Sequence, residues 1–550
     1  MAGINASELC LLPFGGSGEI GLNANLYCYK GSAILVDLGV SFTDIAGIEV
    51  VVPDLGALSS LPVKLEAIFL THAHEDHIGA VAYVWRKFGL SCPIYATTFA
   101  YYMLKNKLSE RDIDASIHKV AYKKEVSAGE FSVTFLGITH SAPDSAALAI
   151  KTDLGIVVHT GDWKIDRSPQ VGNPTDEESF KKLGDEGVLA LVCDSTNAID
   201  QDCPWGESEV CKELERLVGE CENMVIVACF ASNVARMLSC VKAAQKNNRK
   251  VVLAGTSLRR VSQIAQKVGY LDKTVKFISD REAGNMRSSE FLVIATGSQG
   301  EPRSALANMS RRAHPSIKID NSTVVIFSSS VIPGNEKAVF GLQNRLIELG
   351  ARIISERDIA KVHVSGHPSK SDLREMYSWI RPKIAVPIHG EAVHLQEHAK
   401  LAKDFGVDDI VIPKNGRILK IAPGVPRLGD GFRSGKLFVD GDRLIKSDGD
   451  VIKDRYKMME AGVVFVTLVA SADTRKVSSA RISMRGISED IAELEEINKN
   501  LSDLFKKPLF RTVVKGGEKA MKETVHKEIS QFFNQCIGKK PMTQTQIVMI

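Results

Sequence analysis

The sequence predicts a large α/β protein that ends in a small α+β module. Its 550 residues correspond to roughly three domains of about 150 residues each. Short apolar segments separated by glycines fill the N-terminal part, and from about Glu207 strand patterns alternate with helical patterns. Such alternation is typical of a parallel sheet whose strands are joined by crossover helices.

Composition and charge exclude several classes of protein. The chain has 69 Lys and Arg against 66 Asp and Glu, so the net charge of +3 gives no argument for a nucleic-acid partner. The ten cysteines form no Cys-x-x-Cys pair and indicate reduced thiols. No signal peptide is expected at the N-terminus, and the longest uncharged apolar stretch, Ala461–Ala472, is shorter than the roughly 20 residues of a membrane helix. We therefore expect a soluble cytoplasmic protein with no membrane partner.

The N-terminal part reads as a series of short strands, with a helix expected at Ile78–Phe88. The expected strands are Cys10–Phe14, Ala24–Tyr29, Ala33–Asp37, Leu65–Thr71, Ser132–Thr139, Gly155–Thr160 and Val188–Cys193.

The middle part alternates between strand and helix. Strands are expected at Met224–Phe230, Lys250–Ala254, Phe291–Thr296, Thr323–Ser328 and Lys383–Ile388, and helices at Val234–Lys246, Ser257–Val268, Glu336–Leu349 and Val393–Phe405.

A domain boundary is expected at the polar stretch from Ser447 to Lys457. Beyond it, Val463–Ala470 and Val477–Met484 read as strands, and Ile547–Ile550 as a last strand. Two apolar series recur at helical spacing. They are Ile491, Leu494, Ile497, Leu501 and Leu504, and Met521, Val525, Ile529, Phe532 and Cys536.

The segment Thr71–His77 carries the strongest chemical signal. His72, His74, Asp76 and His77 place four candidate metal ligands within six residues, directly after an apolar strand. His72 and His74 alternate and therefore point to one side of an extended backbone, whereas the adjacent Asp76 and His77 point differently. This arrangement suits two neighbouring metals better than one, and imidazole and carboxylate are both zinc ligands. The alternative is a solvated polar loop.

This motif resembles that of the metallo-β-lactamase superfamily. The resemblance implies further ligands at the ends of later strands, and His140, Asp162 and His389 each follow an apolar strand. Asp37 matches the early aspartate that braces the ligand loop in this superfamily.

The spacing of these residues resembles the β-CASP branch of the superfamily, which processes nucleic acids. The last ligand lies 389 − 162 = 227 residues after the previous one, so an extra α/β unit is expected between them. The implied fold is α/β, with a metallo-β-lactamase αββα sandwich, an inserted β-CASP α/β domain and a small C-terminal α+β domain. The expected divisions are residues 1–207 and 368–448 for the sandwich, 208–367 for the insert, 449–460 for a linker and 461–550 for the C-terminal domain.

Finer strings resemble bacterial ribonuclease J along nearly the whole chain. They are GGSGEIGLN, THAHEDHIGA, DSTNA, FASNVAR, ATGSQGEP, SSSVIPGNE and HVSGH. The resemblance implies two divalent metal ions per chain, zinc first, with manganese or magnesium as alternatives. It gives His72, His74 and His140 to one metal, and Asp76, His77 and His389 to the other. Asp162 would bridge the two metals.

The resemblance also implies roles around the cleaved bond. His367 would donate a proton to the leaving ribose oxygen, and Asp194 would orient it. The 5′ phosphate end of RNA would be bound by two segments, of which one lies at the start of a helix, where free N–H groups favour anions. The binding residues are Ser232, Asn233 and Val234 in that segment, and His363, Val364, Ser365, Gly366 and His367 in the other.

The implied function is a metal-dependent ribonuclease. It would degrade RNA in the 5′-to-3′ direction with a preference for 5′-monophosphate ends, with internal cleavage as an additional activity, in rRNA maturation and mRNA decay. A homodimer or homotetramer and an RNA-degrading complex are the expected assemblies. The alternatives are a β-CASP nuclease acting on DNA, a small-ester hydrolase and a scaffold subunit. The insert argues against the ester hydrolase, and the HVSGH and FASNV strings argue against DNA.

Two other patterns have simpler interpretations. The glycines of the sequence Gly16–Gly21 match a dinucleotide fingerprint, but a strand, not a helix, is expected after them. Tight turns beside the metal site explain these glycines better. His394 and His398 are spaced four apart on an expected helix, and we place them on a solvated helix face.

Overall fold

The computed structural model describes residues 4–43, 45, 47–471, 476–507 and 517–550. Within this described part, no helix is long and apolar enough to cross a membrane. The chain forms two compact units, one made of Met1–Thr43 and Val50–Lys436 and the other of Asp44–Glu49 and Leu437–Ile550. The first unit contains every residue that the sequence predicts to be a metal ligand, a catalytic residue or a substrate-binding residue.

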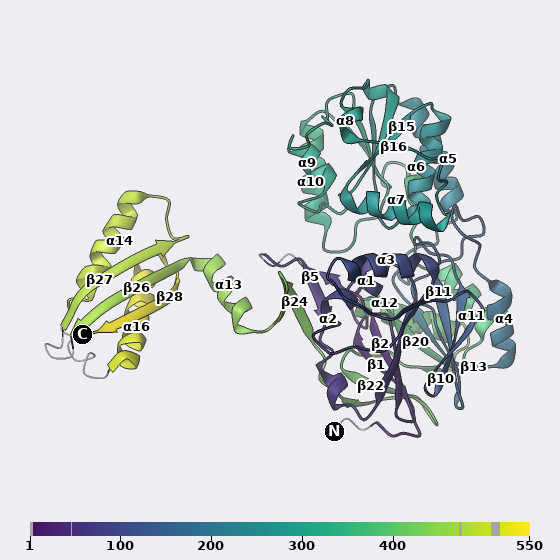
Figure 1. The fold of residues 1–550 in the computed structure, drawn as a ribbon, viewed down its shortest axis with the longest axis horizontal. Helices are drawn as coiled ribbons and strands as arrows, with labels where there is room; N and C mark the ends of the chain where they lie inside the picture. The colour runs from purple at the N-terminus through teal and green to yellow at the C-terminus, as the bar shows by residue number, and fades with distance from the viewer. Residues whose placement is uncertain (1–3, 44, 46, 472–475, 508–516) are drawn as a thin grey trace. The chain divides into compact units, whose positions relative to one another are not determined.

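Two large β-sheets pack face to face in the first unit (Figure 1). The first sheet runs β23 (Arg427–Gly431), β22 (Arg417–Ala422), β1 (Leu9–Gly15), β2 (Ala24–Tyr29), β3 (Ser32–Val36), β6 (Lys64–Leu70), β7 (Ile94–Ala96) and β8 (Ile117–Lys119). The second runs β21 (Asp409–Ile410), β20 (Ile384–Ile388), β13 (Val188–Asp194), β12 (Gly155–His159), β11 (Ala146–Thr152), β10 (Phe131–Gly137) and β9 (Glu125–Ala128). A short antiparallel pair, β4 (Ser41–Phe42) and β5 (Val50–Pro53), and the 3-10 helix η1 (Gly56–Ser60) also belong to this unit.

Helices cover the outer faces of these sheets. Apolar side chains of α4 (Glu177–Glu186), α11 (Lys370–Ile380) and α12 (Ala392–Asp404) pack on the second sheet, and α3 (Thr98–Ser109) contacts β7 and β8 of the first. The order of layers is therefore the αββα sandwich that the resemblance implies.

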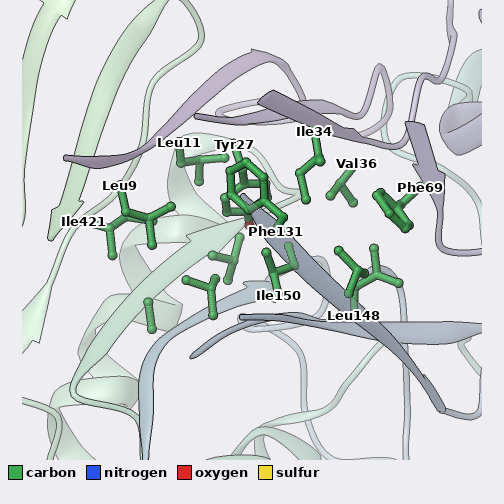
Figure 2. Packing of buried hydrophobic residues seen from close by; sticks show 14 of the residues in the cluster. Leu9, Leu11, Tyr27, Ile34, Val36, Phe69, Phe131, Leu148, Ile150 and Ile421 are labelled. Atoms are coloured by element: carbon green, nitrogen blue, oxygen red, sulfur yellow. The ribbon is translucent and has the colours of Figure 1, made fainter. Parts of the chain in front are cut away.

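The main core lies between the two sheets, as Figure 2 shows. Strand β11 illustrates why its sequence suits this position. Leu148 and Ile150 face the other sheet, whereas the intervening Ala147 and Ala149 face the helices on the outside. Because side chains alternate along a strand, a strand covered on both faces must be apolar at nearly every position.

The helix expected at Ile78–Phe88 is wrong as a single element. The segment forms two short helices, α1 (Glu75–Ile78) and α2 (Val81–Val84). The backbone after β3 interrupts them, because Leu38 N–H donates to the His77 carbonyl at 2.7 Å and Val40 N–H to the Glu75 carbonyl at 3.0 Å. These bonds hold the metal-ligand segment against the first sheet.

A third, wholly parallel sheet is inserted between β13 and β20. Its order is β16 (Phe277–Ile278), β15 (Lys250–Ala254), β17 (Phe291–Ala295), β14 (Val225–Ala228), β18 (Val324–Phe327) and β19 (Arg352–Ile354). Its helices are α5 (Glu207–Glu220), α6 (Val234–Lys246), α7 (Thr256–Val268), α8 (Asp280–Ala283), α9 (Ala305–Ser310) and α10 (Glu336–Glu348), with the 3-10 helices η2 (Ser288–Glu290) and η3 (Ala360–Val362). The predicted parallel sheet with crossover helices is confirmed.

The second unit contains a three-stranded sheet covered by two helices. Strand β26 (Val463–Ser471) is antiparallel to β27 (Lys476–Arg485) and parallel to β28 (Met542–Met549). Apolar side chains of α14 (Ile491–Leu504) and α16 (Gly517–Ile537) form its core with the sheet. A hairpin of β24 (Lys436–Asp440) and β25 (Arg443–Lys446) precedes them.

Residues 449–460, expected to be a linker, form a helix instead. Helix α13 (Asp450–Ala461) buries only Ile452 among its side chains, and its other large apolar residues, Val451, Tyr456, Met458 and Met459, are exposed. The charged residues between them gave the polar signal that indicated a linker. The last strand also begins earlier than expected, at Met542, because its first residues are threonines and glutamines with little apolar signal.

Candidate metal centre

Candidate metal ligands collect at one edge of the sandwich, where strands of both sheets end. The segment Thr71–His77 follows β6, His140 follows β10, Asp162 follows β12 and His389 follows β20. Because β12, β13 and β20 are parallel neighbours, their carboxyl ends lie at the same edge, where ligands bind in open α/β sheets. The structure therefore brings together residues that are more than 300 positions apart in the sequence.

The first group consists of His72, His74, His140 and Asp162. Its ligand atoms all lie within 4.8 Å of one another. His140 Nε2 lies 3.0 Å from His74 Nδ1, and His72 Nε2 lies 3.7 Å from Asp162 Oδ2. Three imidazoles and a carboxylate at this spacing suit a zinc-like ion.

The second group consists of Asp76, His77, Asp162 and His389, again within 4.8 Å. Asp162 Oδ1 lies 3.1 Å from His77 Nε2 and 2.9 Å from His389 Nδ1. Asp76 Oδ2 lies 3.3 Å from His389 Nε2. Asp162 belongs to both groups, which is the arrangement of a carboxylate shared by two ions.

Buried atoms without hydrogen-bond partners support a metal at this position. His72 Nε2, His389 Nε2 and Asp162 Oδ1 are all buried, and none of them has a hydrogen bond of good geometry, although Asp162 Oδ1 lies 2.9 Å from His389 Nδ1. Buried polar atoms are nearly always satisfied, so unsatisfied imidazole and carboxylate atoms that face one another indicate a bound cation. The residues present therefore fit divalent metal ions.

Burial controls the charge of the first group. It lowers the pKa of His72 and His140 well below the usual range and that of His74 to about 4. The neutral imidazole, which is the form that binds metals, is therefore favoured at these positions. In Asp162, burial works against the charged form, but the neighbouring His389 and His77 outweigh it and lower the pKa.

Asp37 holds the ligand segment Thr71–His77 in place. Its Oδ2 lies 2.7 Å from His77 Nδ1, and its Oδ1 accepts from the Thr71 N–H at 2.8 Å. Asp37 is buried and has a positive φ of 61°. A second partner on the far nitrogen fixes the orientation of a ligating imidazole, which is the bracing role expected from the sequence.

His367 lies beside the metal groups and pairs with Asp194. The two side chains meet through His367 Nδ1 and Asp194 Oδ2 at 2.8 Å. Asp194 is held in turn by the N–H and hydroxyl of Thr196, which donate to its Oδ1 at 2.9 and 2.7 Å. Burial disfavours a charged His367, but Asp194 and Asp162 outweigh it and raise its pKa. A third group of possible ligands has its ligand atoms within 4.8 Å of one another, and it consists of Asp162, Asp194, His367 and His389.

The segment His363–His367 is fixed against the metal groups by its backbone. The Gly366 carbonyl lies 2.7 Å from His140 Nδ1. A Cβ at Gly366 would lie 2.8 Å from His140 Cε1, so only glycine allows this approach. Asn197 Nδ2 donates to Ser365 Oγ at 2.8 Å and to the His367 carbonyl at 3.1 Å. Asn197 was not singled out in the sequence, although it stands in the DSTNA string after Asp194.

A cavity of about 360 Å³ adjoins this segment. His363, Val364, Ser365 and His367 line it, whereas the described lining does not include Ser232, Asn233 or Val234.

The expected free N–H groups at the start of α6 have partners within the chain. Asn233 N–H donates to the Phe230 carbonyl at 3.2 Å, and Val234 N–H to the Ser232 carbonyl at 3.0 Å. The Asn233 side chain caps the helix by accepting from the Arg236 N–H at 2.8 Å. These turn hydrogen bonds and the helix cap satisfy N–H groups that were expected from the sequence to be free.

The solvated face expected for His394 and His398 is wrong. His394 is buried, and its Nδ1 accepts from the Glu391 N–H at the start of α12 at 3.0 Å. His398 is fully buried, with its Nδ1 2.8 Å from Ser195 Oγ and its Nε2 3.0 Å from the phenol oxygen Oη of Tyr377. Neither belongs to the metal groups found among the described residues.

Family models match successive parts of the chain. They are the metallo-beta-lactamase superfamily over residues 18–176, the beta-CASP domain of ribonuclease J over 222–346, the Zn-dependent metallo-hydrolase RNA specificity domain over 354–413 and the ribonuclease J C-terminal domain over 450–550. The ribonuclease J of Sinorhizobium meliloti is 38% identical over 99% of this chain and 98% of its own length. The chain belongs to the ribonuclease J family.

Other relatives agree with this assignment. The ribonuclease J of Corynebacterium glutamicum is 38% identical over 90% of this chain and 70% of its own length. That of Helicobacter pylori strain 26695 is 32% identical over 90% of this chain and 73% of its own length. Membership confirms the predicted fold class and identifies the chain as a hydrolytic nuclease of the metallo-β-lactamase superfamily.

A solved structure shares the fold at low sequence identity. The crystal structure of a protein of unknown function from Enterococcus faecalis V583 matches with a TM-score of 0.51 and 16% identity. The match covers 75% of this chain and all of that one. At this identity the likeness concerns the fold alone.

Proposed function

We propose that this ribonuclease J family member is a dinuclear metal-dependent ribonuclease that degrades RNA from a 5′-monophosphate end and also cuts internally. The observation that carries the proposal is the position of His367. It is oriented by Asp194 at 2.8 Å and lies beside two ligand groups that share Asp162. The roles in rRNA maturation and mRNA decay follow from the family resemblance.

Two metal ions fit the two ligand groups. His72, His74 and His140 would hold one ion, Asp76, His77 and His389 the other, with Asp162 in contact with both. Zinc is the first candidate, with manganese or magnesium as alternatives. When bound, such ions supply Lewis acidity and a water of lowered pKa for attack on a phosphodiester.

Metal analysis tests this assignment. The purified protein should contain about two divalent ions per chain, as dinuclear hydrolases do. His77→Ala should lose at least one of them, whereas substitution of the exposed His118 should lose none. A His77→Ala variant that keeps both ions and full activity would show that the ligand assignment is wrong.

His367 is the proposed proton donor to the leaving ribose oxygen. Its Nδ1 is committed to Asp194, so Nε2 is the nitrogen left to face a substrate. The carboxylates that raise its pKa favour the protonated ring, which an acid requires.

The 5′ end is proposed to bind beside the segment His363–His367. Ser365 Oγ accepts from Asn197 Nδ2 and from the His367 N–H at 3.2 Å, so its hydroxyl hydrogen remains able to donate to a phosphate. Ser232 and the start of α6 stay a proposed second contact, although the N–H groups of Asn233 and Val234 already have acceptors.

Assembly and location are proposed on separate grounds. The second unit, which contains none of the proposed catalytic residues, supports self-association into a dimer or tetramer, and the enzyme would join an RNA-degrading complex. The ten cysteines are all free thiols, which fits a reducing cytoplasm.

A cleavage time course tests the activity. Matched RNAs with a 5′ monophosphate or a 5′ triphosphate are incubated with the protein, with and without a chelator, beside a DNA of the same sequence. We expect mononucleotide release to favour the monophosphate RNA, internal cleavage to be indifferent to the 5′ end, and the chelator to abolish both. Equal cleavage of DNA would favour the alternative of a DNA nuclease, and no cleavage of any substrate by metal-loaded protein would favour a scaffold role.

A further inference from the structure

Three buried side chains form a continuous network of hydrogen bonds next to Asp194. His398 Nδ1 lies 2.8 Å from Ser195 Oγ, and His398 Nε2 lies 3.0 Å from the phenol oxygen Oη of Tyr377. Ser195 and His398 are fully buried, and Tyr377 is 3% exposed. None of the three belongs to the ligand groups found among the described residues. We name them the Ser195–His398–Tyr377 network.

Each member of the network lies on the segment that follows one residue of the third ligand group. The serine directly follows Asp194 at the end of β13. The tyrosine lies on α11, the first helix after His367, and the histidine lies on α12, the first helix after His389. The network therefore ties together the three segments that bring these residues to the ligand edge.

The hydrogen bonds of this network run in one direction. A neutral imidazole has one donor and one acceptor nitrogen, and burial lowers the pKa of His398 to about 4, so the ring is neutral. Within the described part of the chain, His398 Nε2 is the acceptor in reach of the buried Tyr377 hydroxyl. The hydroxyl therefore donates to Nε2, and the Nδ1–H donates to Ser195 Oγ. The Ser195 hydroxyl in turn donates to the Cys193 carbonyl at 3.4 Å.

Ser195 lies in the turn that positions the Asp194 carboxylate. The two side chains leave the backbone on opposite sides, since neighbouring side chains alternate at the end of a strand. The carboxylate lies 2.8 Å from His367 Nδ1, whereas the hydroxyl lies at His398. The Ser195 N–H donates to the His389 carbonyl at 3.3 Å. Anchoring the hydroxyl therefore fixes the backbone from which the carboxylate projects.

The surroundings of the network leave it little freedom. A Cβ at Gly390 would lie 3.4 Å from Ser195 Cβ and 2.9 Å from His394 Cβ, so the two segments touch closely. Tyr377 packs among apolar side chains on the second sheet, and its ring meets that of His398 edge-on, with 5.8 Å between the centroids. A buried polar network whose members all have partners holds its residues rigidly.

We propose that His398 is a positioning residue for the proposed proton donor. By holding Ser195, it keeps the Asp194 carboxylate at hydrogen-bond distance from His367. This role rests on the proposed function, because it assigns His398 to the step in which His367 donates its proton. His398 is fully buried, so it acts through the turn and not on the RNA itself.

Single-turnover cleavage of 5′-monophosphate RNA by the full-length, metal-loaded protein tests this role. His398→Phe keeps an aromatic ring but offers no N–H to Ser195. At saturating RNA its cleavage rate should fall about tenfold to hundredfold, since misplacement of a catalytic group by about 1 Å can cost that much. Its affinity for RNA and its metal content should stay within about twofold of the wild-type values, because no proposed ligand or substrate-binding residue is changed.

A cycle of double variants separates positioning from a general loss of structure. If His398 acts through His367, adding His398→Phe to His367→Ala should slow cleavage by less than about twofold more. A general loss would instead multiply with that of His367→Ala. His398→Asn is the matched variant, because its amide N–H takes the place of the Nδ1–H, and its rate should lie within about threefold of wild type. His398→Gln, whose amide lies further out, at the place of Nε2, should not restore the rate.

A crystal structure of His398→Phe adds a measurement that needs no activity. The distance from His367 Nδ1 to Asp194 Oδ2, 2.8 Å in the wild type, should exceed about 3.5 Å, the limit of a hydrogen bond. His314→Phe, which changes a histidine of the inserted domain bonded to the Ile317 N–H, is the control and should leave the rate and this distance unchanged. If His398→Phe does not fold, as judged by thermal unfolding, Ser195→Ala removes the same hydrogen bond and takes its place.

The outcomes are distinct. Cleavage by His398→Phe within about threefold of wild type overturns this role, as does a loss that multiplies with that of His367→Ala. A loss that His398→Asn fails to relieve, or that His398→Gln relieves equally, also overturns it. Loss of metal from His398→Phe overturns it too, because His398 would then act through a ligand. Wild-type protein that cleaves no RNA contradicts the proposed function, and the distance from His367 to Asp194 in the variant then decides this role alone: an unchanged distance overturns it.

Discussion

Replacing His367 by alanine tests the chemistry most directly, because the structure separates this residue from the two main ligand groups. Its Nδ1 is paired with Asp194 at 2.8 Å, and its side chain is 22% exposed, so it reaches the space where a substrate would lie. Asp162, which both ligand groups share, is 3.9 Å from the same nitrogen. Alanine at this position removes the proposed acid and leaves the first two groups intact.

The expected loss is that of a general acid. We expect the single-turnover rate of RNA cleavage to fall about 10²–10⁴-fold, which corresponds to about 2.7–5.4 kcal/mol of activation free energy. Because Asp194 acts through His367, the double variant Asp194→Asn/His367→Ala should be little slower than His367→Ala alone. The affinity for RNA should change only severalfold, since the rest of the segment keeps its bonds to Asn197.

The assay is single-turnover cleavage of 5′-monophosphate RNA, with metal content measured on the same preparations. His118→Ala, an exposed histidine on β8, is the matched control and should behave as wild type. A His367→Ala variant that cleaves within threefold of the wild-type rate would refute the role of proton donor. A variant that loses metal would instead identify His367 as a ligand of the third group, with Asp162, Asp194 and His389.

Three further predictions concern support of the site and assembly. Asp37→Asn removes the carboxylate beside His77 Nδ1, so zinc affinity measured by titration should fall about 10–100-fold; unchanged affinity would show that His77 needs no such brace. Arg236→Met leaves the buried Glu207 without its bidentate partner, and we expect urea unfolding of the first unit to show about 3–5 kcal/mol less stability. The double variant Glu207→Gln/Arg236→Met should recover much of that loss, and failure to recover would place the cost elsewhere. Truncation after Ser447 should lower the molecular mass seen by light scattering while metal content stays constant; an oligomer with the same number of chains would contradict a role for the second unit in assembly.

The position of the candidate ligands at one edge could be predicted because each of them follows a strand rich in apolar residues. The strands ending at Leu70 and Ile388 are readable from composition alone, and the residues after them fall at the sheet edge as a consequence. Thus His72 and His389 both lie close to Asp162, although nothing local in the sequence links them. Short strands such as β7 and the edge strand β8 were missed because three residues carry too little pattern.

The sequence did not reveal side chains whose hydrogen-bond partners lie far away along the chain or within the same helical turn. His398 looks like a surface histidine by helical spacing, yet the phenol of Tyr377 and the hydroxyl of Ser195 enclose it. Residue spacing also does not reveal that the Asn233 side chain caps its own helix.

The chain leaves the sandwich for the inserted domain at Asp194 and returns at His367. These are the residues proposed to orient and to donate the proton. Strands β13 and β20 are parallel neighbours with Asp194 opposite Ile388, so Asp194 and the residue before His389 lie at the same edge of the sheet. The outgoing and returning paths are bonded to each other beside the metal groups, through Asn197 and Ser365 at 2.8 Å and through Asp194 and His367 at 2.8 Å. The ligand segment after β6 is held separately, by Asp37 and the backbone of the first sheet. The segment Thr71–His77 and the His367–Asp194 pair therefore have different supports, whereas the Gly366 carbonyl links the returning path to His140 at 2.7 Å.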